Sequence, residues 1–159
     1  MEFNLSGKIT LDDFVRFNKF YLKYILFKGW RKIIFPSSLI IIACAIIASR
    51  NYYLMIGIFM FIIVFYILLK KNLKKQYYSN KFYMEEQHFF ITKDQIEIKS
   101  ENAYVSITKD KINEILYNKD AIYVFISSYL AYVMPKTFLH DNNFDLLKDF
   151  IKEHYKKLK

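Results

Sequence analysis

The strongest constraint in this sequence is a long apolar stretch, residues 33–69, in which Arg50 is the only charged side chain. Arg50 and Asn51 divide it into two segments, residues 33–49 and 52–69. A helix of that length rises about 26 Å, close to the roughly 30 Å hydrocarbon core of a bilayer. We therefore predict a two-helix transmembrane hairpin with a very short turn.

Basic and aromatic residues stand at the outer ends of both segments. Long cations and Trp or Tyr place their polar ends in the membrane interface, so they extend the reach of a slightly short span. The candidates for contact with lipid and for setting the topology are Trp30, Arg31, Lys32, Lys70, Lys71, Lys74 and Lys75.

A soluble helical hairpin and a cleaved signal peptide are the alternatives to membrane spans. A soluble chain of 159 residues would have to enclose two helices that are apolar on every side, and too little sequence remains for that. A signal peptide fits poorly because 32 patterned residues precede the apolar stretch, which is two spans long. We therefore predict localisation in the cell membrane.

The basic residues are unequally distributed over the two sides of the membrane. Lys28 and the six cations named above lie at the outer ends of the spans, whereas only Arg50 lies at the turn. Under the positive-inside rule the cation-rich side is cytoplasmic. We therefore predict a multi-pass protein with both termini in the cytoplasm. Neither span contains Asp, Glu, Lys or His, which argues against a transporter because such groups mark ion pathways.

The net charge of +9 does not indicate a nucleic-acid partner, because of where the charge lies. Residues 1–32 carry +4 and residues 70–81 carry +5, whereas residues 82–159 carry −1. A nucleic-acid-binding domain would carry cations on its folded surface. Near the inner leaflet each cation contributes about 1 kcal/mol toward anionic lipid. The cluster at residues 70–75 serves either anchoring and topology or specific binding of anionic lipid.

The first 32 residues predict a short strand over residues 2–9 and then an amphipathic helix. Thr10 has the position of an N-cap, and Asp13 follows three residues later as in a capping box. The helix lies in the membrane interface or packs on the C-terminal domain, and the sequence leaves both open. Residues 70–81 are expected to form a basic juxtamembrane linker. The aromatic face of the helix is Phe14, Phe17, Tyr21 and Tyr24.

Residues 82–159 predict a separate cytoplasmic β domain. Short apolar runs alternate with polar turns, which is typical of an antiparallel meander, and both faces of residues 121–127 are apolar. An amphipathic helix capped by Asn142 or Asn143 follows. The predicted fold is an α+β membrane protein with a pleckstrin-homology-like antiparallel β-barrel closed by a C-terminal helix. The predicted strands are residues 82–92, 95–99, 103–108, 112–117, 121–127 and 130–134.

Three segments carry a resemblance to a known family. They are the Ile9-Thr10-Leu11-Asp12-Asp13-Phe14 start of the first helix, residues 90–100 (FITKDQIEIKS), and residues 122–127 (IYVFIS) leading to residues 131–136 (AYVMPK). With the two spans between them, the chain resembles the YcxB-like family of small bacterial membrane proteins. The resemblance implies a membrane-anchored protein with a cytoplasmic domain, and it carries over no catalytic residues.

The sequence offers no convergent set of catalytic or metal-binding residues. The three histidines, His88, His140 and His154, share no ligand spacing with Cys44 or with one another. Glu85, Glu86 and His88 fit a solvated strand edge better than an acid–base pair. Ser127 and Ser128 lack the glycines of a nucleophile elbow. We therefore predict no enzyme activity, no cofactor and no metal ion.

Two functions fit these observations. The first is a non-enzymatic interaction or sensory module, of which a small immunity protein is one version, whose cytoplasmic domain binds a protein partner along an exposed strand edge. The second is a module that binds anionic lipid through the juxtamembrane lysines. The near-neutral charge of residues 82–159 counts against a lipid-binding domain. The bilayer is a partner in both cases.

Overall fold

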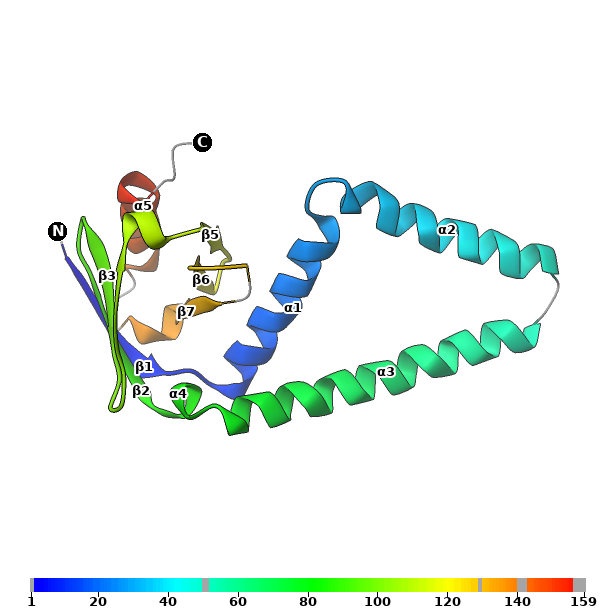
Figure 1. Cartoon of the computed structure of the whole chain (residues 1–159), viewed down its shortest axis with the longest axis horizontal. Coiled ribbons are helices and arrows are strands. Elements are labelled where there is room, and N and C mark those ends of the chain that lie inside the picture. Colours follow the sequence, from blue (N-terminus) through cyan, green and yellow to red (C-terminus); the bar gives the residue numbers. More distant parts are fainter. Residues whose placement is uncertain (1, 50–51, 129, 140–142, 156–159) are drawn as a thin grey trace. The chain divides into compact units, whose positions relative to one another are not determined.

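The computed structural model describes residues 2–49, 52–128, 130–139 and 143–155 (Figure 1). The chain divides into two compact units. The sheet unit comprises Met1–Asp13 and Asn80–Lys159, and the helical unit comprises Phe14–Ser79. The first strand therefore belongs to the same unit as the C-terminal residues, although the sequence suggests an N-terminal segment of its own.

The first helix, α1 (Leu11–Phe27), begins at the predicted cap. The Asp13 backbone N–H donates to Thr10 Oγ1 at 3.1 Å, and the Thr10 N–H donates to Asp13 Oδ2 at 3.2 Å. This reciprocal pair satisfies two N–H groups that the helix itself leaves without partners. The predicted capping box is confirmed.

Two long helices follow α1 in the helical unit, α2 (Arg31–Ser49) and α3 (Tyr52–Ser79). Within the described ranges one segment, Ile56–Ser79, is long and apolar enough to cross a membrane by length and composition. Its most apolar 18 residues have a mean hydropathy of 2.0 and none of them is buried. One spanning helix is thus supported, whereas the two-span hairpin stays a prediction. Its predicted turn at Arg50 and Asn51 lies outside the described residues.

The helix α3 continues to Ser79 and so includes most of residues 70–81, which were predicted to form a basic linker. Its 28 residues make it about 42 Å long. Lysine is a good helix former, and no Gly or Pro interrupts residues 58–79, so nothing in the sequence ends the helix at the edge of the apolar run. The residues predicted as a basic linker are therefore mostly helical.

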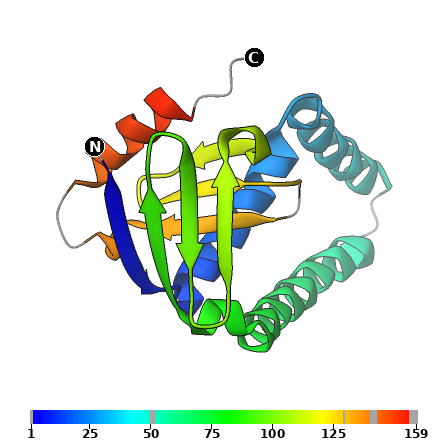
Figure 2. The ribbon, with the colours of Figure 1, turned by 60° about the vertical axis from the view of Figure 1, so that its left-hand side comes forward.

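The sheet unit contains two antiparallel sheets in the described residues. The first has the order β1-β2-β3-β4, and the second has the order β5-β6-β7 (Figure 2). The predicted closed barrel is wrong, because no strand pairing joins the two sheets in the part of the chain described. The strands are β1 (Phe3–Lys8), β2 (Glu86–Ile91), β3 (Gln95–Lys99), β4 (Tyr104–Thr108), β5 (Glu114–Tyr117), β6 (Ala121–Phe125) and β7 (Ala131–Pro135).

The structure differs from the predicted strands at the start of the meander and in its middle, where two short helical turns replace extended chain. The predicted strand over residues 82–92 is a one-turn helix, α4 (Lys81–Met84), followed by β2, because Asn80 Oδ1 accepts from the Phe82 N–H at 3.0 Å and caps the turn. A 3₁₀ turn, η1 (Lys109–Lys111), separates β4 from β5 and delays the predicted strand over 112–117 until Glu114. This turn changes the direction of the chain between the two sheets.

The core lies between the sheets. On β2 buried and exposed side chains alternate, with Gln87, Phe89 and Ile91 facing inward. All five residues of β6 are buried and β6 is the central strand of its sheet, in agreement with the two apolar faces of residues 121–127. Gly7 on β1 leaves room for the ring of Phe138, because a Cβ at Gly7 would lie only 2.7 Å from Phe138 Cε1.

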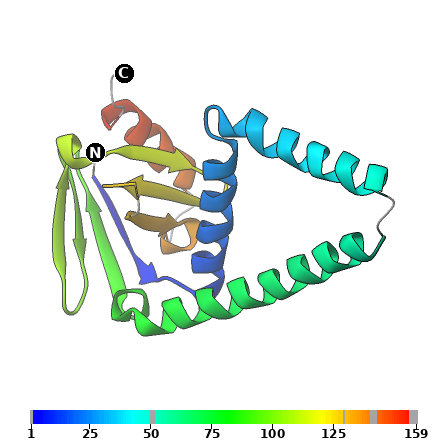
Figure 3. The same ribbon diagram turned by 45° about the vertical axis from the view of Figure 1, so that its right-hand side comes forward.

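The C-terminal helix α5 (Phe144–His154) contacts both sheets (Figure 3). The Phe150 ring lies 5.2 Å from that of Phe3 on β1, and the Lys152 ammonium lies 5.7 Å from the ring centre of Tyr117 on β5. Tyr155 directly follows the end of α5, and its hydroxyl donates to the Thr92 carbonyl at 2.7 Å. The predicted amphipathic helix is confirmed. Of its two predicted caps, Asn143 makes no side-chain capping bond and Asn142 lies outside the described residues.

Candidate functional site

The four lysines predicted to contact lipid lie on one side of α3. Positions 70, 71, 74 and 75 fall within an arc of about 140° on a helix, and all four side chains are exposed. Leu69, Leu73 and Tyr77 lie on another side; the two leucines are half-buried and Tyr77 is buried. The ring of Tyr77 packs 5.9 Å from that of Phe14 on α1. The structure thus brings Lys70, Lys71, Lys74 and Lys75 together as one surface, which we call the lysine face.

Of the other three predicted residues, Trp30 lies in the turn between α1 and α2, and Arg31 and Lys32 are the first two residues of α2. Gly29 has φ = 59°, in the left-handed region that favours glycine, and this lets the chain turn before α2. The Trp30 carbonyl then accepts from the N–H of Ile34 at 3.1 Å. All three side chains are exposed. Among the described residues no hydrogen bond or ion pair joins this group to the lysine face.

Polar contacts fix the short segment that follows α3 to the sheet unit. Gln87 is fully buried, and its Nε2 donates to the Phe82 carbonyl at 2.9 Å. The Phe82 ring in turn packs 5.9 Å from that of Tyr132 on β7. Glu85 accepts from Asn102 Nδ2 at 2.7 Å, which ties this segment to the turn between β3 and β4. The sequence patterns described above do not predict this junction, although a Gln at an inward position of a strand is a signal for it.

The junction also engages both carboxylate oxygens of Glu85, which accept from the backbone N–H and the side-chain Nδ2 of Asn102. Hydrogen bonds from Asn102 are the main reason that the pKa of Glu85 lies below its ordinary value. A general base near neutral pH needs the opposite shift. His88 lies on the outward face of β2, in register with Ser6 and Lys99. Glu86 is exposed at the start of the same strand.

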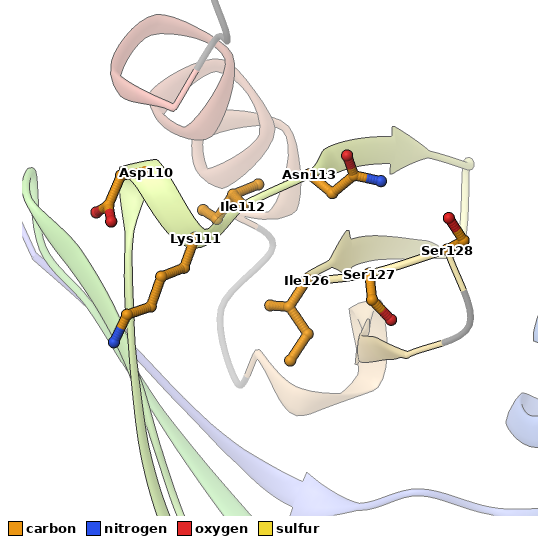
Figure 4. Close-up of a pocket in the computed structure, with 7 residues that line it drawn as sticks. All are labelled: Asp110, Lys111, Ile112, Asn113, Ile126, Ser127 and Ser128. Atoms are coloured by element: carbon orange, nitrogen blue, oxygen red, sulfur yellow. The ribbon is translucent and has the colours of Figure 1, made fainter.

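A shallow cavity of about 350 Å³ lies between η1 and the connection from β6 to β7 (Figure 4). In this view the ends of the Asp110 and Lys111 side chains both point to the lower left, and the amide of Asn113 points away from them. A hydrogen bond from Thr108 is the main reason that the pKa of Asp110 is lowered. Ser127 Oγ accepts from the Leu130 N–H at 3.1 Å. The cavity is lined by Asp110, Lys111, Ile112, Asn113, Ile126, Ser127 and Ser128.

The residues that line this cavity include two serines, Ser127 and Ser128, and neither His nor Cys is among the described lining residues. The described part of the chain also holds no group of three His, Cys, Asp or Glu that could bind a metal ion. His140, one of the three histidines, lies outside that part.

The edge of the four-stranded sheet at β4 differs from the other strand edges. Proteins prevent unwanted pairing at sheet edges with charged residues or proline. The edge strands β1, β5 and β7 contain Lys8, Glu114 and Pro135, respectively. By contrast β4 has the sequence YVSIT, with no charge, no proline and no glycine. Its residues are of the types most frequent in strands.

The hydrogen-bond pattern of the β3–β4 hairpin determines which backbone groups of β4 point outward. The Ser100 N–H donates to the Ala103 carbonyl at 2.8 Å, so this pair is hydrogen-bonded. Hydrogen-bonded and non-hydrogen-bonded pairs alternate along an antiparallel ladder. In the observed register, Tyr104, Ser106 and Thr108 therefore direct their N–H and C=O groups away from β3. We call this side of β4 the free edge.

The side chains at the free edge are uncharged and partly exposed. Tyr104 is 63% exposed, and Val105 is only half-buried although its partner Ile98 is fully buried. Partial loss of solvent around the hydroxyl, and then the charge of Glu97, raise the pKa of Tyr104. None of the five side chains of β4 carries a charge.

One family comparison matches the sheet unit. A family model described as YcxB-like protein matches residues 91–151. Over residues 91–151, which we call the YcxB-like segment, the chain is similar to that family. The match confirms the resemblance over the region from the end of β2 to α5. No curated protein and no solved structure matches the chain.

The YcxB-like segment includes some of the candidate features and not others. It contains the whole of β4 with its free edge, the cavity beside η1, and Asn102 of the junction. The lysine face and the buried Gln87 precede it. Both the free edge and the cavity beside η1 therefore lie in the YcxB-like segment.

The Glu85–Asn102 contact gives a testable pH dependence. In the full chain, the pKa of Glu85 measured by NMR is expected below 4.5, and Asn102→Ala should raise it toward that value. Because the folded pKa is lowered, this contact stabilises the fold above about pH 4.5 and is lost as the pH falls through the folded pKa. Asn118→Ala, at another turn of the sheet unit, is the control and should leave the pKa of Glu85 unchanged. An unchanged value in Asn102→Ala would contradict the assignment.

Proposed function

We propose that this protein is a membrane-anchored, non-enzymatic interaction module of the sensory or immunity type, whose sheet unit binds a protein partner at the free edge of β4. The observation that carries the proposal is an edge strand without charge or proline whose Tyr104, Ser106 and Thr108 direct backbone donors and acceptors outward. No cofactor, metal ion or nucleic acid takes part in this function.

Strand addition fits the chemistry of the free edge. An added strand gains main-chain hydrogen bonds, and side chains on alternate faces supply selectivity. Val105 would be covered on the inward face and Tyr104 on the outward face. Tyrosine is also among the residues that contribute most to protein interfaces. The partner thus needs an extended, uncharged segment of about five residues.

We propose that the sheet unit is pleckstrin-homology-like. The support for this is the layout of a four-stranded and a three-stranded antiparallel sheet with a C-terminal helix that contacts both. The resemblance is one of architecture, and fold alone does not fix a function. Function is therefore argued from the free edge and the lysine face.

We propose that both α2 and α3 cross the membrane and that both termini lie in the cytoplasm. The support is the apolar sequence of both helices and the seven cations at their outer ends. A single cysteine at position 118, in a chain with Cys44→Ser, should resist a membrane-impermeable maleimide applied to intact cells. The same site should react once the cells are opened. Labelling from outside would contradict the orientation.

Site-specific photo-crosslinking tests the protein-binding function. A photoreactive amino acid at Tyr104, in the full chain in its native membrane, should form a protein adduct. The matched control is Leu146 on α5, which is also about half exposed. Ser106→Pro removes one outward N–H, and an edge strand tolerates proline where its N–H faces away from the sheet, so this change should abolish the adduct at position 104. No adduct, or equal adducts at position 146, would contradict the proposal.

The lysine face favours a second function, the binding of anionic lipid. The four lysines occupy about 7.5 Å along α3, directly after the apolar run ends at Leu69. The polar layer on each side of a bilayer is roughly 5–7 Å thick. The lysine face therefore spans the depth at which lipid phosphates lie, if Leu69 marks the edge of the hydrocarbon core. About 1 kcal/mol per cation would give a clear preference for anionic lipid.

Spin-labelled lipids test this second function in bilayers that hold the full chain. The fraction of phosphatidylglycerol immobilised by the protein should exceed that of phosphatidylcholine and should fall with added salt. Replacement of Lys70, Lys71, Lys74 and Lys75 by Gln should remove the preference. The control replaces four exposed lysines of the sheet unit, Lys93, Lys99, Lys119 and Lys136, and should retain it. Equal preferences in the two variants would exclude the lysine face as the binding surface.

A further inference from the structure

We propose that the strand added at the free edge is β4 of a second copy of this chain, paired antiparallel about Ser106. This inference rests on the proposed protein-binding function and names its partner. The product is a symmetric dimer in which two four-stranded sheets become one sheet of eight strands.

The symmetric register matches the side chains of β4. With Ser106 opposite its own copy, Tyr104 lies opposite the Thr108 of the second chain, and Val105 lies opposite the second chain's Ile107. Val105 and Ile107 both lie on the inward face, in register with Ile98 and Ile96. The apolar pair therefore extends the core, and the aromatic and β-branched pair lies on the outward face, where such cross-strand pairs are favourable.

The same register matches the backbone groups. The residues that direct N–H and C=O groups outward are Tyr104, Ser106 and Thr108, which are placed symmetrically about Ser106. A two-fold rotation through Ser106 places Tyr104 of each copy opposite Thr108 of the other and places Ser106 opposite Ser106. Every outward donor of one copy thus meets an acceptor of the other, so all five residues of β4 are used.

A second copy suits this edge better than a strand of another protein. The free edge has no charged side chain within β4 that would select a charged partner or set its direction. Its own sequence supplies the complement. Copies anchored in one membrane also share an orientation and a small volume, which raises their effective concentration.

The other edges explain why pairing would stop at two copies. Both outer strands of the eight-stranded sheet would be β1, which contains Lys8. The second sheet ends in β5 and β7, which contain Glu114 and Pro135. Each copy thus has one unprotected edge in its described strands. The contact is isologous and closes, rather than growing into a filament.

Disulfide crosslinking in native membranes tests the register. Ser106→Cys in the full chain with Cys44→Ser should form a product of twice the chain mass on mild oxidation. Hydrogen-bonded opposite residues have Cα atoms about 5.5 Å apart, which is within the range for a disulfide. The matched control is Ser6→Cys on β1, a half-buried serine on the outward face of the opposite edge of the same sheet. It should remain monomeric.

Charge exchange at the same position provides a second, independent readout. Ser106→Lys places two like charges opposite each other at the symmetry axis, and so does Ser106→Glu, so each variant alone should lose co-purification of two differently tagged copies. Co-expression of the Lys variant with the Glu variant should restore it. Circular dichroism of each variant shows whether the fold is retained, and the rescue itself excludes simple misfolding.

The outcomes separate this inference from the function on which it rests. Adducts at position 104 whose mass is not twice that of the chain, together with no crosslink at Ser106→Cys, would overturn the dimer and leave protein binding in place. No adduct of any kind would overturn both. Equal crosslinking at Ser6→Cys would show random collision and would overturn the dimer. Failure of the Lys and Glu variants to restore association would do the same.

Discussion

The pairing of β1 with β2 is the interaction on which the rest of the structure depends. It joins Phe3–Lys8 to Glu86–Ile91 in an antiparallel register, so residues that are some eighty positions apart form neighbouring strands. Without it the first strand would have no partner and the inward faces of β2, β3 and β4 would lose Phe3 and Leu5, both of which are buried. It also brings Lys8 opposite Glu86, and thereby fixes where the chain leaves the sheet unit and where it returns.

The sequence predicts the parts of the fold that depend on local pattern. Alternation over Gln95–Lys99 and the capping box at Thr10 and Asp13 predict elements that the structure contains. The pairing of β1 with β2 is not predictable from periodicity, because an alternating pattern shows that a segment is a strand but does not show which distant strand it pairs with. The closed barrel was predicted from the number of strands, whereas the turn at Lys109–Lys111 directs the chain into a second sheet instead.

The candidate surfaces were predictable to different degrees, for physical reasons. Each lysine of the lysine face follows from charge and position, but their shared side of α3 depends on the helix continuing past Leu69. The role of Gln87 depends on a carbonyl five residues away, which a single strand pattern does not reveal. The free edge depends on the strand order and on which residues of β4 form hydrogen-bonded pairs with β3, as fixed by the bond between Ser100 and Ala103. Neither property can be predicted from local composition.

The position of the helical unit between β1 and β2 has a consequence for folding and for protein engineering. Because β1 and β2 are adjacent antiparallel strands, they form a β-hairpin whose loop contains α1, α2, α3 and α4. The entropy cost of closing a flexible loop grows only with the logarithm of its length, about 0.6 kcal/mol for each doubling, so residues 9–85 would cost about 3 kcal/mol more than a two-residue turn. A sheet unit in which a short loop joins the residues up to Ile9 to those from Asn80 onward would keep the strand order and the contacts of Phe82 and Glu85 without the helical unit.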